Sequence, residues 1–181
     1  MPGANNVYIE ASYRGHVTPP GDYELILKVG DTILNTNCTI KNNPLYKDSF
    51  EDYQDYDKFM KIMENNVIDM HQKVNTLYNI QGQLSEVIGY LKKNSKNEDL
   101  TKAGEALLKK LKKWDEEMVQ RKSKAYDDVE NFPNKFTANY LFLLNQSDNI
   151  LPRINQSSKD RKIELDKKWQ NYKIQAETIM N

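Results

Sequence analysis

Hydrophobic positions along the chain change their spacing near residue 45. Before that point, apolar residues alternate with polar ones over residues 7–13 and 23–29, which is the period of two expected of a half-buried strand. Gly30-Asp31 follows with glycine first, which predicts a two-residue type II′ hairpin turn and a return strand over residues 32–41. Pro44 has no N–H for further strand pairing. We therefore expect residues 1–45 to form an antiparallel hairpin or a three-stranded β-segment.

After residue 45, apolar residues recur every three or four positions, which is the spacing of amphipathic helices. The first run predicts a helix of roughly 40 residues, about 60 Å long. Its seam is Tyr56, Met60, Met63, Val67, Met70, Val74, Leu77, Gln81, Leu84, Ile88 and Leu91. A second helix is expected from about Asn97, with the seam Leu100, Ala103, Leu107, Leu111, Trp114 and Met118.

Two more helices complete the predicted bundle. A loop around Pro133 leads into a short helix over about residues 135–145. The last helix begins at Pro152 or Ser157, with the seam Ile154, Arg161, Leu165, Trp169, Tyr172, Ala176 and Ile179. The fold class is therefore mainly α, with three long helices and one short helix in an up-down bundle over residues 46–181.

Composition excludes several classes of protein. The 26 basic and 26 acidic residues balance to a net charge of zero, which argues against binding nucleic acid through bulk charge. No run of 18 apolar residues is present, so no membrane span is expected, and the first six residues lack the features of a signal peptide. The single cysteine, Cys38, cannot form an internal disulfide and is interpreted as a small apolar residue on a strand.

Motifs that carry chemistry are absent from the sequence. His16 and His71 lie in different segments without the spacing of metal ligands, and no phosphate-binding, nucleotide-binding or hydrolase motif occurs. We therefore expect no catalytic residue, no cofactor and no metal ion, and we do not expect an enzyme.

Charged clusters leave two interpretations open. The acidic residues Asp48, Glu51, Asp52, Asp55 and Asp57 are interleaved with Tyr46, Tyr53 and Tyr56. They suit a helix N-terminus, whose dipole favours acids, or alternatively a calcium or sugar site in which tyrosine rings face a glycan. With Tyr23, these tyrosines form the candidate ligand or interaction surface. The basic run at 109–113 is flanked by acids and is interpreted as a solvated bundle face.

Two motifs resemble a known family. Residues 19–30 read PPGDYELILKVG, which is similar to a hairpin near the end of bacterial sortilin-like, BNR-repeat β-propeller proteins often labelled glycosyl hydrolases. That hairpin closes an immunoglobulin-like β-domain, and an Asp-Pro-Arg motif then leads into a helical tail. Asn43 and Leu45 replace the aspartate and arginine here. Residues 131–136, NFPNKF, resemble the family's entry to a short helix, with Phe136 in place of leucine.

The resemblance covers about residues 17–181 and implies a non-catalytic accessory module of an exported protein, periplasmic or extracellular. Any hydrolase activity would then lie in an upstream propeller domain, which would be the module's partner. A carbohydrate-binding or carbohydrate-processing module and a free-standing helical interaction protein are the alternatives. Because three strands cannot close a sandwich, we expect the strands either to pack on the long helix or to pair with another copy of the chain.

Overall fold

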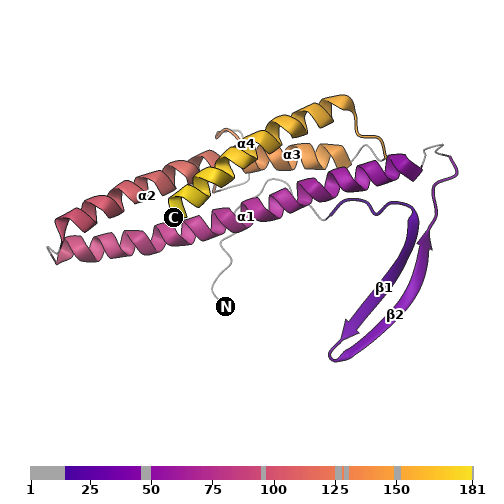
Figure 1. The fold of residues 1–181 in the computed structure, drawn as a ribbon, viewed down its shortest axis with the longest axis horizontal. Coiled ribbons are helices and arrows are strands. Elements are labelled where there is room, and N and C mark those ends of the chain that lie inside the picture. The colour runs from indigo at the N-terminus through magenta and orange to yellow at the C-terminus, as the bar shows by residue number, and fades with distance from the viewer. Residues whose placement is uncertain are drawn as a thin grey trace.

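A computed structural model gives the fold of the protein, and it describes residues 15–45, 50–94, 97–124, 128, 131–148 and 152–180. In these ranges, two strands and four helices follow one another in the order β1, β2, α1, α2, α3, α4. Figure 1 shows the helices packed lengthwise into a bundle, with the two strands extending away from it. The predicted mainly α fold with a small antiparallel hairpin is confirmed.

The hairpin consists of β1 (Gly21–Val29) and β2 (Thr32–Ile40), paired antiparallel from Gly21 opposite Ile40 to Val29 opposite Thr32. Gly30 has a φ of +57° and Asp31 lies outside the left-handed region, as a type II′ turn requires. The predicted strand over residues 7–13 lies outside the described residues.

Helix α1 (Phe50–Lys93) has 44 residues and runs the length of the bundle. Helix α2 (Glu98–Met118) returns antiparallel along its C-terminal half. Asn97 caps α2, because its side-chain oxygen accepts a hydrogen bond from the Leu100 N–H at 3.1 Å. Helix α3 (Phe136–Asp148) continues in the direction of α2 along the N-terminal half of α1, and α4 (Gln156–Met180) packs back across both.

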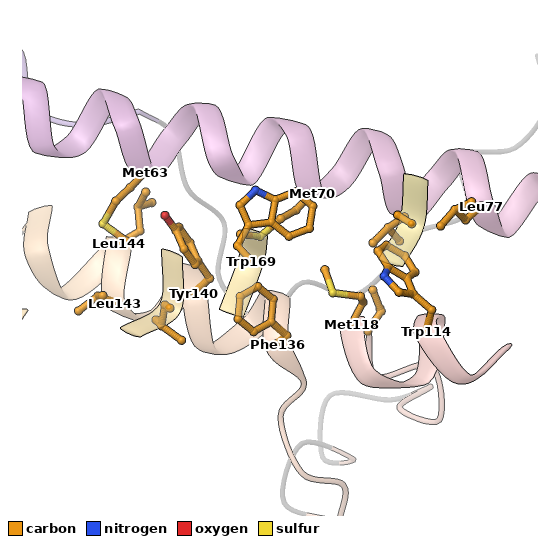
Figure 2. Packing of buried hydrophobic residues seen from close by; sticks show 14 of the residues in the cluster. Met63, Met70, Leu77, Trp114, Met118, Phe136, Tyr140, Leu143, Leu144 and Trp169 are labelled. Carbon is orange, nitrogen blue, oxygen red and sulfur yellow. The ribbon is translucent and has the colours of Figure 1, made fainter. Parts of the chain in front are cut away.

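One hydrophobic core joins all four helices (Figure 2). Its fully buried side chains include three aromatic residues, Trp169, Tyr56 and Tyr140, and the methionine row of α1. The α1 seam predicted from the spacing is confirmed over most of its length, with buried residues at Tyr56, Met60, Met63, Met70, Val74, Leu77 and Ile88.

Three predicted seam positions are wrong. Leu100 and Ala103 are exposed, although they continue the spacing of Leu107 and Leu111. The N-terminal part of α2 packs mainly on α1, so it buries a narrower stripe than a helix inside a bundle. Gly104 lies on that stripe, where a Cβ would stand 3.1 Å from the Ile88 Cγ1. Arg161 of α4 is also exposed and forms an ion pair with Glu164 instead.

Candidate functional site

The hairpin has one apolar face and one polar face, because side chains alternate between the faces of a strand. The apolar face consists of Tyr23, Leu25, Leu27, Val29, Leu34, Cys38 and Ile40, together with Gly21 and two threonines. The polar face consists of Asp22, Glu24, Ile26, Lys28, Ile33, Asn35, Asn37 and Thr39. Two cross-strand hydrogen bonds occupy the polar face, from the Asn35 amide to Glu24 and from the Thr39 hydroxyl to Asp22.

The apolar face is uncovered over most of its length. Leu25, Leu27, Val29 and Leu34 are each more than half exposed, and within the described residues both outer strand edges are unpaired. The hairpin therefore does not pack along the long helix, and this part of the expectation is wrong (Figure 1). A two-stranded sheet that stands free in water is marginally stable at best, so this face is a candidate contact surface.

Residues 15–20, here called the strap, connect the hairpin to the bundle and hold it there through His16. The Nδ1 atom of His16 lies 2.8 Å from Glu64 Oε1, and its Nε2 atom lies 2.9 Å from Asp57 Oδ1. The backbone N–H of His16 also donates to Glu64 at 3.0 Å. The next backbone N–H, of Val17, donates to Asp148 at the end of α3 at 3.1 Å.

Tyr56 of α1 and Asp148 of α3 lie beneath His16 and Val17 and contact them. The Tyr56 hydroxyl donates to Asp148, and the edge of its ring faces the His16 imidazole with 5.7 Å between centroids. Burial, followed by the hydrogen bond to Asp148, raises the pKa of Tyr56. The Tyr56 ring is fully buried, so it belongs to the core and is closed to a ligand.

The charged groups at the strap shift one another's pKa values in the directions that favour their charged forms. Burial lowers the pKa of His16, but hydrogen bonds to Glu64 and Asp57 outweigh this effect, so the pKa is raised above the ordinary histidine value. Burial raises the pKa of Asp57, but hydrogen bonds from Lys61 and His16 outweigh it and lower the pKa. A neutral imidazole has only one N–H, so only the protonated ring donates to both carboxylates.

The candidate tyrosines are only partly brought together. Tyr23 and Tyr53 line an open hollow of about 710 Å³ between the strap, β1 and α1. Both hydroxyls are engaged, that of Tyr23 with the Pro19 carbonyl at 2.7 Å and that of Tyr53 with Asn42 at 2.7 Å. Tyr53 is buried. Tyr46 lies outside the described residues.

The acidic cluster does not converge on one point. Asp57 faces His16 and Lys61, whereas Asp52 lies 3.5 Å from Arg153 in an ion pair on another side of α1. Asp55 is exposed, and nothing is described of Asp48 or of the Glu51 side chain. Within the described part of the chain, no group of three or more acidic, histidine or cysteine side chains is placed to hold a metal ion.

The other residues considered for chemistry in the sequence analysis, His71 and Cys38, lie apart from the strap. His71 is half-buried on the flank of α1, where burial lowers its pKa. Cys38 lies on β2 opposite Tyr23, as its interpretation as a strand residue predicts. No helix in the described ranges is long and apolar enough to span a membrane.

Sequence reasoning missed the role of His16 because its partners are 41 and 48 residues away. One signal was available: Asp57 and Glu64 are seven residues apart, so both lie on one side of the helix two turns from each other. Comparison with models of protein families, with curated proteins and with solved structures finds no match for this chain.

Proposed function

We propose that this chain is a non-catalytic accessory module of an exported, glycosyl hydrolase-like β-propeller protein, and that it makes its contact through the apolar face of the hairpin. The observation that carries the proposal is the uncovered row of Leu25, Leu27, Val29 and Leu34 on a sheet whose edges no other described strand pairs with. The resemblance of residues 19–30 and 131–136 to that family supports the identity of the parent protein.

Energetics favour a partner for this face. Full burial of a leucine or valine side chain is worth about 1.5–3 kcal/mol. Because the four side chains are already partly covered, docking them would gain on the order of 4 kcal/mol. The open edges add backbone hydrogen bonds if the partner is itself a β-sheet, which suits β-structure encoded upstream in the parent protein.

A non-catalytic role fits the placement of the histidines, which are the commonest general bases. Both ring nitrogens of His16 are engaged by carboxylates, and His71 is half-buried on the flank of α1. A glycan-binding role would need exposed tyrosine faces. Tyr53 and Tyr56 are both buried, so this alternative has less support.

Two steps test the proposal. The reading frame upstream of Met1 should encode a β-propeller, and its absence would contradict the proposed parent. If a propeller is encoded there, calorimetry measures the affinity of this chain for that upstream region. The measurement is made for the unmutated chain and for two variants. Leu27→Asp places a charge on the apolar face, and Ile26→Asp is its matched control on the polar face, because the two side chains are 57% and 54% exposed.

The expected result is at least about a tenfold loss of affinity for L27D and a much smaller change for I26D. Binding of L27D as tight as that of the parent chain would overturn the proposal. The melting temperatures of both variants should match that of the unmutated chain, because neither side chain belongs to the bundle core.

A further inference from the structure

We infer that His16 is a proton-controlled latch, which holds the hairpin in one orientation on the bundle while its imidazole is protonated and releases it when the proton is lost. The inference concerns regulation of the apolar face and rests on the proposed function for its biological meaning. The structural change itself is independent of any partner.

The geometry of the latch requires two donors on one ring. Glu64 Oε1 and Asp57 Oδ1 lie within hydrogen-bond distance of opposite ring nitrogens, and carboxylates only accept. Loss of one proton leaves a nitrogen lone pair that faces a carboxylate oxygen at under 3 Å. One favourable contact is thereby replaced by a repulsive one, while the remaining N–H can serve only one of the two acids.

Other charged and titratable groups around His16 bias the latch toward closure. From α1, Lys61 forms an ion pair with Asp57 and keeps that carboxylate charged, and Tyr56 contacts the ring by its edge. From α3, Asp148 accepts from the neighbouring Val17 N–H and from the Tyr56 hydroxyl. Tyr23 of β1 lines the same hollow as His16. Among the described residues, the acids Asp57, Glu64 and Asp148 outnumber the single cation Lys61 around the ring and favour the imidazolium.

Release of the ring would loosen the hairpin, because His16 makes three of the described hydrogen bonds between the strap and the helices. Besides the three His16 hydrogen bonds, the Val17 N–H donates to Asp148, Pro19 of the strap is buried, and Asn42 after β2 accepts from the Tyr53 hydroxyl of α1. Beyond the strap, β1 and β2 contact mainly each other, and their apolar side chains face water. Opening would therefore leave the bundle folded while the hairpin changes its orientation.

The test measures the distance from the hairpin tip to α1 as a function of pH. Spin labels are attached to D31C at the turn and N79C on an exposed site of α1, with C38S to remove the native thiol, in the full chain. The expected result is a narrow distance distribution at pH about 6, below the ordinary histidine pKa, and a broad one once the pH has risen through the raised pKa of His16.

Matched variants make the test specific, since the chain has only two histidines. H16Q has no ring proton to lose and should give the broad distribution at both pH values. H71Q should give the same pH-dependent distance distribution as the chain with both histidines. Circular dichroism checks that the bundle stays folded in each variant. An unchanged, narrow distribution in the parent at both pH values, or a narrow one in H16Q, would overturn the latch. A pH-dependent distribution combined with unimpaired partner binding by L27D would instead uphold the latch and refute the proposed function.

Discussion

Replacing Leu77 with alanine tests the register of the long helix at the centre of the bundle. Leu77 is 1% exposed and belongs to the core cluster that also holds Trp114 of α2 (Figure 2). The substitution removes three carbon atoms, and loss of their burial costs about 0.8 kcal/mol each, or about 2.4 kcal/mol. Incomplete collapse around the missing atoms leaves a cavity, which brings the expected loss of stability to about 3–4 kcal/mol.

Leu100→Ala is the matched control for this experiment. The same atoms are removed, but Leu100 is 53% exposed on α2, so the expected change is within about 0.5 kcal/mol. Urea unfolding followed by tryptophan fluorescence measures both, because Trp114 and Trp169 are buried in the core. A loss under about 1 kcal/mol for Leu77→Ala, or equal losses at the two sites, would refute the observed packing.

Three further predictions concern stability. Gln81→Leu should stabilise the chain by about 1 kcal/mol in urea unfolding, because the buried Gln81 Nε2 has no hydrogen-bond partner among the residues that the structure describes. A loss of stability would contradict this. Gly89→Ala should raise the free energy of unfolding by about 0.5–1 kcal/mol, since the added Cβ would meet open space. Gly104→Ala should raise it less, because the added Cβ would crowd Ile88. Equal increases would contradict the close approach of α2 to α1. The stability that protonated His16 contributes is fully present below its unfolded pKa of about 6.5 and is lost as the pH rises through its raised folded pKa. The melting temperature of H16Q should therefore lie below that of the parent at pH about 6 and approach it at pH about 9, and a constant difference would contradict the assignment.

The helical part of the fold could be predicted from local spacing. In α1 the three-and-four repeat matches the buried face because helices cover it along its whole length, as Met60 and Leu77 show. The same rule was wrong at Leu100, where α2 has essentially one neighbour and buries a narrower stripe. Spacing reports how a helix could bury a face, whereas the number of neighbours decides how much of that face is buried.

The hairpin and the strap differ in how much their sequence reveals. Alternation and Gly30-Asp31 predict the two strands and their turn, because both signals are local. Neither signal predicts that the apolar face remains uncovered, since that depends on where the helices lie. The His16 contacts join segments more than 40 residues apart, and a single polar residue in a loop carries no periodicity. Tyr56 was placed both in the seam and on a candidate surface, and its burial assigns it to the seam.

Hydrogen exchange of the isolated chain tests the central claim most directly, which is that the apolar face of the hairpin is open until a partner covers it. Because β1 and β2 pair with no further strand within the described ranges, their amides should exchange several orders of magnitude faster than those at the centre of α1 near Leu77. The measurement is made on a sample shown by light scattering to be monomeric. Protection of the hairpin amides equal to that of the α1 amides in this monomer would mean that the face is already covered, and it would contradict the account.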